Sequence, residues 1–230
     1  MTTWIKVARY HLVDRTNYLV LPWAILAFGF LVTLALLASA GPASHPQSPS
    51  GALFSIYVFF FVLGMLNTFR SLPFGLVLGA SRRSYYAGTA LLAVSLAAVY
   101  GLALAVLQVI ERATGGWGMT LHFFRVAYIF DGPWYLTWLT SFVLLTLLFT
   151  YGTWFGLVYR RWNLPGLLAF IAAQVTMVLV VVVTASDAHA WRAIGHFFIT
   201  LSAAGLTGLL AALAVVLLAG GYATMRRVTV

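Results

Sequence analysis

Long apolar segments fill most of the chain, and short segments between them hold the charged residues. No aspartate, glutamate, lysine or arginine occurs inside the apolar segments. Each is about as long as a helix must be to cross a hydrocarbon core of about 30 Å. The segments are Leu19–Ser39, Leu53–Phe69, Gly88–Ile110, Tyr135–Leu157, Leu164–Thr184 and Phe197–Ala219. Because lipid offers the backbone no hydrogen-bond partners, the pattern predicts helices.

We therefore expect an all-α polytopic membrane protein in which residues 1–230 form a single transmembrane domain with six transmembrane helices. The composition agrees, since 63% of the residues are hydrophobic and 7% are charged. A soluble domain carries about 25% charged residues, so this composition excludes a soluble fold. The chain has no cysteine, which excludes disulfides and thiolate metal sites.

The positive charges are distributed unevenly between the two sides of the predicted membrane domain. One side holds Lys6, Arg9, Arg15, Arg70, Arg82, Arg83, Arg160, Arg161, Arg226 and Arg227, and the other holds Arg112, Arg125 and Arg192. Basic residues in short loops stay in the cytoplasm, so both termini are expected to be cytoplasmic. The net charge of +9 is thus explained by membrane orientation, and nucleic acid is not expected as a partner.

Three segments outside the predicted spans carry structural signals of their own. Residues 1–18 have a moderately amphipathic pattern, which fits either an interfacial helix on the inner leaflet or an ordinary basic flank of the first span. The inner segment 70–87 is too apolar to be disordered and too short to span. Pro73 suits the first turn of a short helix, Gly79 suits its end, and Ser81 can cap the next span. This segment could dock on a cytoplasmic partner, or it could only fix the orientation.

The outer segment 111–134 has a helix-breaking start and an aromatic centre. Gly115, Gly116 and Gly118 interrupt the third span. The following stretch, Met119–Phe130, is short for a span, and it is predicted to form a re-entrant or interfacial helix that could close the outer mouth of a pathway. The alternative is an aromatic cluster at headgroup depth, anchored by tryptophans. Both interpretations can hold together.

Small residues recur at helical spacing inside the spans, which indicates close helix packing or a dimer interface. The residues in question are Ala93, Ala97, Gly101 and Ala105, then Gly152 and Gly156, and then Ala204, Gly208 and Ala212. Packing within the chain is the preferred interpretation.

Catalytic and energy-coupling motifs are absent from the sequence. The single lysine, Lys6, lies in no P-loop pattern, so the chain is not itself expected to be an enzyme that hydrolyses ATP. The five histidines share no metal-ligand spacing. No ionisable residue lies inside a predicted span, which argues against proton-coupled transport. The polar candidates for a substrate pathway are Asn67, Gln174 and Thr176, while Gln108 lies near the outer end of the third span.

Four short stretches carry a resemblance to a known family. They are Leu72–Leu76, Leu78–Arg83, Tyr85–Thr89 and Glu111–Trp117. With the six-span layout, they resemble the membrane subunits of bacterial ABC exporters in the type-two permease superfamily, particularly actinobacterial ones. The resemblance implies a multi-pass permease of the bacterial cytoplasmic membrane. That permease would pair with a second copy or a paralogue and with two ABC ATPase subunits that carry the ATP and Mg²⁺.

In that family a coupling helix between spans two and three docks on the ATPase. The resemblance implies this role for the residues of the coupling segment, which are Arg70, Pro73, Phe74, Gly75, Gly79, Ser81, Arg82 and Arg83. Residues 1–18 would be the connecting helix. The chain departs from the family in its long outer segment, which follows span three instead of span five. The expected cargo is hydrophobic or amphiphilic, because the spans carry no charge.

Other function classes fit the same layout. An accessory or immunity protein would bind a partner without transporting anything, and it would not need a docking helix. A channel or secondary transporter would work without an ATPase. An intramembrane enzyme has the least support, since His122 and Asp131 are its only outer pairing.

Overall fold

The computed structural model describes residues 16–40, 51–77, 81–126, 130 and 132–225, and it is helical with no strand in these ranges. The predicted all-α class is therefore confirmed. The elements are η1 (Thr16–Val20), α2 (Leu21–Ala40), η2 (Gly51–Leu53), α3 (Phe54–Val77), α4 (Arg82–Ala113), η3 (Gly116–Thr120), α5 (Trp134–Asp187), α6 (Trp191–Thr200) and α7 (Ala203–Met225). Of the expected interfacial helix at 1–18, all but the last three residues lie outside the described residues.

Five of the described helices are long and apolar enough to cross a membrane. One of them, α5, contains two of the six predicted spans in a single element of 54 residues. A straight helix of that length would extend about 80 Å, far more than a bilayer core. The element instead changes direction at Asn163, whose backbone is non-helical (φ 55°, ψ −155°). The last predicted span begins later than expected, because α6 and α7 divide its first residues between them.

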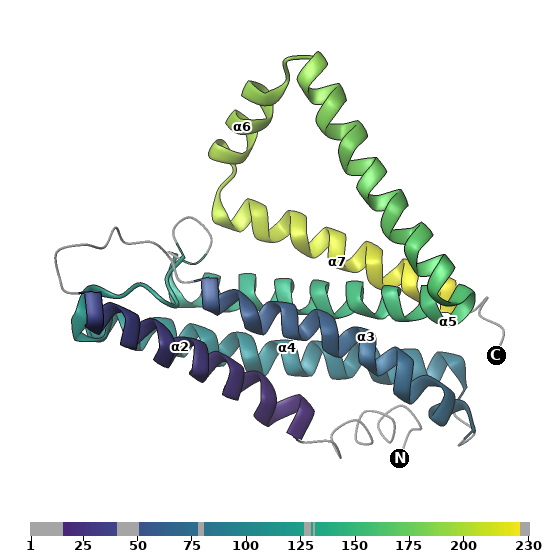
Figure 1. The fold of residues 1–230 in the computed structure, drawn as a ribbon, viewed down its shortest axis with the longest axis horizontal. Helices are drawn as coiled ribbons and strands as arrows, with labels where there is room; N and C mark the ends of the chain where they lie inside the picture. The colour runs from purple at the N-terminus through teal and green to yellow at the C-terminus, as the bar shows by residue number, and fades with distance from the viewer. Residues whose placement is uncertain (1–15, 41–50, 78–80, 127–129, 131, 226–230) are drawn as a thin grey trace.

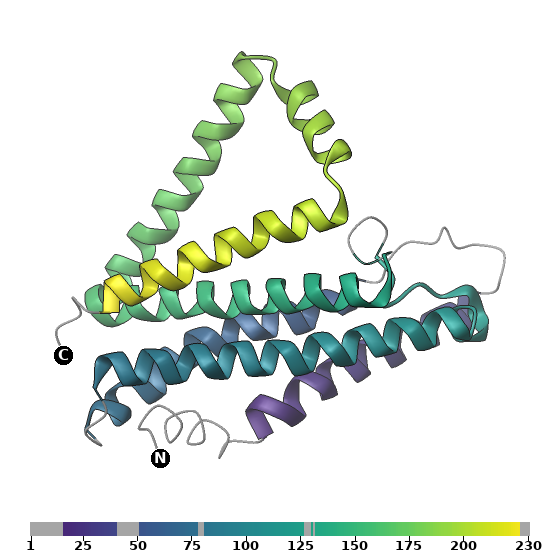
Figure 2. The same ribbon diagram turned by 180° about the vertical axis from the view of Figure 1, so that it is seen from behind.

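A bundle of α2, α3, α4 and the first half of α5 runs along the long axis of the molecule, with α7 lying against α5 (Figures 1 and 2). The end of α3, the start of α4, the bend at Asn163 and the end of α7 gather at one end, which we call the arginine end. Arg82, Arg83, Arg160 and Arg161 belong to it. The opposite end, where α4 finishes and α5 begins, is called the loop end.

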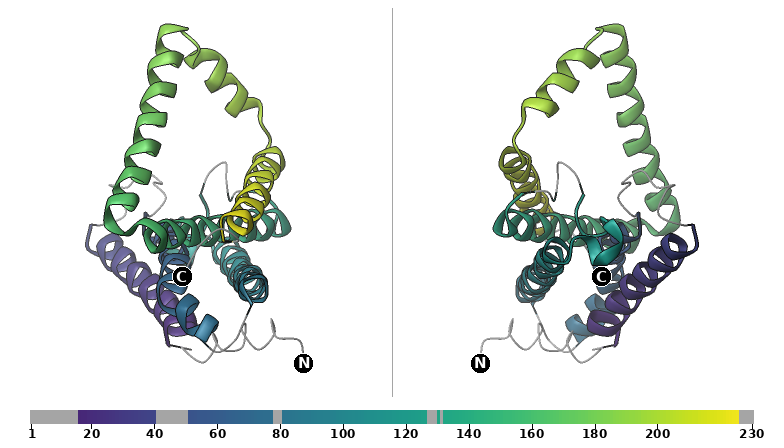
Figure 3. Two further views of the ribbon diagram at one scale, coloured as in Figure 1. Left: turned by 90° about the vertical axis from the view of Figure 1, so that its right-hand side faces the viewer. Right: turned by 90° about the vertical axis from the view of Figure 1, so that its left-hand side faces the viewer.

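The second half of α5 leaves the bundle at Asn163 and returns through α6 to α7, so that these three helices outline a triangle (Figure 1). Seen from the side, α6 and the second half of α5 rise away from the bundle (Figure 3). We call Leu164–Thr200 the arm. Its side chains are almost all exposed, and Met177 and Ile199 are 69% and 79% exposed. Because the helix from Leu164 to Ser186 carries no charge, this surface is suited to lipid and not to water.

Glycines allow α3 and α5 to cross in backbone contact. A Cβ added to Gly152 would collide with the carbonyl group of Phe61, and one added to Gly64 would collide with the carbonyl group of Phe149. A Cβ added to Gly156 would collide with the side chain of Thr68 on α3. Gly101 of α4 approaches the backbone of α5, since its Cβ would lie 3.1 Å from the nitrogen of Phe142. The small residues of α4 and α5 therefore serve packing within the chain.

Hydrogen bonds attach α7 to the bundle. The hydroxyls of Thr140 and Thr207 lie 2.7 Å apart, and the indole nitrogen of Trp154 donates to the carbonyl oxygen of Leu217 at 3.0 Å. The small residues of α7 face elsewhere, because a Cβ on Gly208 would meet no atom within 4 Å. Of the three ridges predicted from the sequence, this one has no packing role within the described chain.

The bend gives a direct prediction for Asn163. Its φ and ψ lie in a region that glycine occupies readily and that costs other residues about 1–3 kcal/mol. We expect Asn163→Gly to raise the melting temperature by about 2–4 °C, after part of the gain is offset by the greater freedom of glycine in the unfolded chain. Asn163→Ala, which adds no such freedom, should lower it. Thermal melts of the purified chain measure both, and equal melting temperatures would show that the bend carries no strain.

Candidate functional site

The loop end is closed by a folded segment that we call the aromatic cap, comprising Gly116–Val126 together with Phe130. The helix expected over Met119–Phe130 is not formed in its described residues, where η3 gives way to irregular backbone after Thr120. Positive φ angles at Gly115, Gly116, Trp117 and Gly118 explain the difference. They turn the chain back over the bundle, which a continuing helix could not do.

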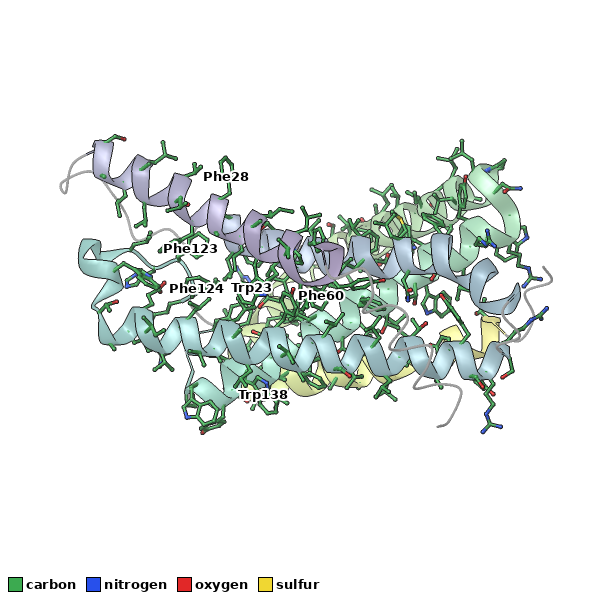
Figure 4. All side chains as sticks on the ribbon, turned by 90° about the horizontal axis from the view of Figure 1, so that it is seen from below. Trp23, Phe28, Phe60, Phe123, Phe124 and Trp138 are labelled. Carbon is green, nitrogen blue, oxygen red and sulfur yellow. The ribbon has the colours of Figure 1, made fainter. Side chains whose placement is uncertain are left out.

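The phenylalanines of the cap point into the protein. Phe123, Phe124 and Phe130 are 0%, 5% and 1% exposed. Phe123 packs edge-on against Phe30 of α2 with ring centres 5.1 Å apart, and Phe130 stacks on Tyr57 of α3 at 6.0 Å. Figure 4 shows Phe123 and Phe124 between α2 and α4, whereas Phe28 points away from the bundle. The phenylalanines therefore form a protein core at the loop end, while the alternative of an aromatic belt anchored by tryptophans stays a prediction.

One carboxylate holds the cap to α4. Glu111, in the last turn of α4, is 1% exposed. Its Oε2 accepts hydrogen bonds from the backbone nitrogens of Phe123 and Phe124 at 3.0 and 2.8 Å and from the indole nitrogen of Trp117 at 3.2 Å. Glu111 is the only charged side chain among the described buried residues, and the sequence interpretation assigned it to an outer loop. No ionisable residue was expected inside a predicted span, and Glu111 directly follows the third span, but its burial at the end of α4 was not expected from the sequence.

A second polar side chain joins the same helix to the cap. Gln108 is fully buried, and its amide nitrogen donates to the carbonyl oxygen of Phe130. Beside this, the guanidinium of Arg112 donates to the carbonyl oxygen of Gly132 at 2.8 Å, at the surface. Three consecutive polar contacts from the last two turns of α4 thus hold the segment that follows it. The spacing of Gln108 and Glu111 at i and i+3 is the signal by which the sequence could have placed both on one helix face.

The arginine end carries the coupling residues predicted from the sequence. Ser81 caps α4 as expected, its hydroxyl accepting a hydrogen bond from the backbone nitrogen of Ser84 at 3.1 Å. Arg83 is exposed and Arg82 is partly exposed, in the first turn of the helix. The backbone from Arg70 through Pro73, Phe74 and Gly75 to Val77 is helical, but it continues α3 and does not form a separate helix. Gly79 lies outside the described residues.

The residues predicted to line a pathway do not come together. Asn67 is buried between α3 and α4, where its amide nitrogen donates to the hydroxyl of Thr89 at 3.5 Å and its backbone oxygen accepts from Tyr85. Gln174 accepts a hydrogen bond from the hydroxyl of Tyr151, which ties the arm to the bundle. Thr176 is exposed on the arm. The contacts of Asn67 and Gln174 describe packing between helices.

A small pocket with a cavity volume of about 10 Å³ lies elsewhere, between α4, α5 and α7. Thr89, Thr150 and Thr153 contribute hydroxyls to its wall. The hydroxyls of Thr150 and Thr153 already donate to the carbonyl oxygens of their own helix. None of the predicted pathway residues lines it. The described residues also contain no group of three or more histidine, cysteine, aspartate or glutamate side chains that could hold a metal ion.

Comparison with known proteins identified no relative of the chain. No protein-family model matches the chain, and neither a curated protein nor a solved structure matches it. Hypotheses about function therefore rest on the two ends of the bundle.

Proposed function

We propose that the chain is a six-span permease subunit of an ATP-driven ABC exporter in the bacterial cytoplasmic membrane, with both termini in the cytoplasm. Six spans follow if the bend at Asn163 divides α5 into two crossings. The arginine end supports the proposed orientation, because four arginines gather where α3 ends, α4 begins and α5 bends. Basic residues of short loops remain cytoplasmic.

The observation that carries the proposal is the exposed basic start of α4 beside the helical end of α3. Arg82 and Arg83 follow the Ser81 cap directly, so a rigid helix presents them at the cytoplasmic end. A cytoplasmic ATPase that closes on ATP would push on residues 70–83. Because α4 is one helix of 32 residues, it would carry that movement to the aromatic cap at the other end. ATP and Mg²⁺ would be bound by the ATPase, and the second permease would be another copy or a paralogue.

The cargo in this proposal is hydrophobic or amphiphilic. Within the arm, the helix from Leu164 to Ser186 offers an uncharged, mostly exposed surface suited to lipid. The described bundle has no charged side chain buried between its ends other than Glu111. Such an interior suits a molecule that enters from the inner leaflet better than it suits an ion in free solution.

Copurification tests the proposal. The chain should copurify with a P-loop ATPase when it is expressed with its genomic neighbours. In the double variant Arg82→Ala, Arg83→Ala, the amount of ATPase recovered should fall at least tenfold. The change Gly75→Leu should weaken it as well. The double variant Arg160→Ala, Arg161→Ala is the matched control, since it removes the same charge from the same end outside the coupling segment. A stable chain that recovers no ATPase, or equal losses in both double variants, would contradict the assignment.

A second candidate is an ATP-independent transporter coupled to an ion. Buried Glu111 favours it, because ionisable residues inside membrane proteins commonly mark ion pathways. This candidate predicts transport by the chain alone, with no ATPase recovered. An accessory or immunity protein would recover a partner but transport nothing.

A further inference from the structure

Two oxygens at the loop end are buried without a hydrogen-bond partner. They are Oε1 of Glu111 and Oε1 of Gln108, on side chains that are 1% and 0% exposed. Both side chains are otherwise engaged, since Oε2 of Glu111 accepts three hydrogen bonds and the amide nitrogen of Gln108 donates to Phe130. A buried acceptor without a partner destabilises the folded state, and the cost is larger when the acceptor is charged.

The two residues lie at i and i+3 on α4, so their side chains share one face of the helix. Both reach the aromatic cap, Glu111 through the backbone of Phe123 and Phe124 and Gln108 through that of Phe130. An ionised carboxylate has no donor, and the oxygen of an amide has none. While the carboxylate is ionised, the two oxygens cannot satisfy each other, and each then needs a cation or a hydrogen-bond donor.

The position of Glu111 sharpens this requirement. It lies in the last turn of α4, which ends at Ala113. The C-terminal end of a helix carries the negative end of the helix dipole and the free carbonyl groups, so it disfavours a carboxylate and favours a cation. In an environment of low dielectric constant, both effects are stronger than in water. The only other charged group of that turn, Arg112, is exposed and donates to Gly132.

We propose that Oε1 of Glu111 and Oε1 of Gln108 are two ligands of a small hard cation, Na⁺ or Ca²⁺, held between α4 and the aromatic cap. Carboxylate, amide and hydroxyl oxygens are the ligands that such cations prefer. The other two unpartnered buried oxygens in the described chain, Ser55 Oγ and Thr137 Oγ1, belong to the first turns of α3 and α5 at the same end. The cation fastens the cap to the bundle in the closed arrangement seen here.

Thermal melts of the purified full-length chain test the site. At matched ionic strength, Na⁺ or Ca²⁺ should raise the melting temperature relative to choline by about 3 °C at ten times the dissociation constant. Glu111→Gln keeps an acceptor oxygen for the cap but removes the charge, and it should abolish the shift. Asp187→Asn is the matched control, because it removes one exposed carboxylate from the end of α5 and should leave the shift intact.

Binding of radioactive Na⁺ or Ca²⁺ gives a second readout that does not depend on stability, with one site per chain expected and none in Glu111→Gln. A melting temperature that is the same in Na⁺, Ca²⁺ and choline would overturn the proposal. An equal shift in wild type and Glu111→Gln would overturn it too, as would stabilisation by acid alone, which would identify the partner as a proton. None of these results depends on whether an ATPase copurifies.

Discussion

Gly152→Ala should prevent the chain from folding stably in the membrane. The added methyl group would fall on the carbonyl group of Phe61, with its carbon at 2.9 Å and its oxygen closer still, and 3.0 Å from the backbone nitrogen of Met65. These atoms are backbone, so no side-chain rotation relieves the overlap. The two helices must separate, and the packing along their whole crossing is weakened with them.

The expected loss is about 3 kcal/mol or more, at the upper end of what overpacking a buried site costs. It would be measured as lower yield of monodisperse protein in detergent and as a lower melting temperature. Gly64→Ala should behave in the same way, because its methyl group would meet the carbonyl group of Phe149 on the same crossing. The double variant should cost less than the sum, since one separation of α3 from α5 relieves both overlaps.

Gly208→Ala is the matched control on α7. It makes the same chemical change in a transmembrane helix, but its methyl group would meet nothing within 4 Å. Alanine also favours helix over glycine by up to about 1 kcal/mol, so this variant should be as stable as the wild type or slightly more so. Similar losses at Gly152 and Gly208 would show that helix propensity or lipid contact, and not the α3–α5 crossing, decides the outcome.

The helices were predictable because their signal is local. An uncharged apolar segment long enough to span a membrane can form all its backbone hydrogen bonds in lipid only as a helix. Each such segment therefore predicted a helix, whatever its neighbours in the fold. The Ser81 cap is local in the same sense, since the hydroxyl and its partner at Ser84 are three residues apart. Close helix packing was also predictable from the ridge through Gly101 and from the pair Gly152 and Gly156. Their spacing alone, however, did not indicate which helix is the partner.

The sequence predicted a break between Leu157 and Leu164, where the bend lies, but it did not predict the direction of the bend or the path of the cap. Asn163 adopts a backbone conformation more typical of glycine. Neither the residue type nor the neighbouring sequence indicates that the following helix leaves the bundle. In the cap, three glycines signalled a break, but the aromatic run after them reads equally as a helix. The path of the cap depends on two contacts that the local sequence does not show. Phe123 packs on Phe30, which lies about 90 residues earlier in the chain, and the backbone of Phe124 bonds to Glu111 on the preceding helix.

Glu111 illustrates the limit most clearly. In the sequence it is the first charged residue after a long apolar run, and a charge in that place normally marks the membrane surface. Only the return of the cap over the end of α4 buries it. The sequence analysis thus placed the residue correctly at the end of the helix but assigned it to solvent. It therefore did not consider Glu111 as a pathway residue and named Gln174 and Thr176, which lie on the arm.

Glu111→Leu should release the aromatic cap from the bundle. The change removes the acceptor of three donors, which are the buried backbone nitrogens of Phe123 and Phe124 and the partly buried indole of Trp117. Each buried group left unpaired costs about 1–3 kcal/mol, so the closed cap loses roughly 3 kcal/mol or more. Leucine fills a similar volume, which keeps α4 itself helical. The cap should therefore open while the rest of the bundle remains folded.

Cysteine labelling can follow this opening, because the chain has no cysteine of its own. A single Val126→Cys substitution places a thiol in the cap at a position that is 8% exposed. A membrane-impermeant maleimide should label it slowly in the otherwise wild-type chain and at least tenfold faster beside Glu111→Leu. In choline buffer without Na⁺ or Ca²⁺, where the proposed cation does not contribute, Glu111→Gln keeps an oxygen acceptor for the same donors and should stay close to the slow rate. Equal protection of the thiol beside leucine and glutamate would mean that the phenylalanine packing holds the cap without the carboxylate, and that burial of Glu111 serves another purpose at this end of the bundle.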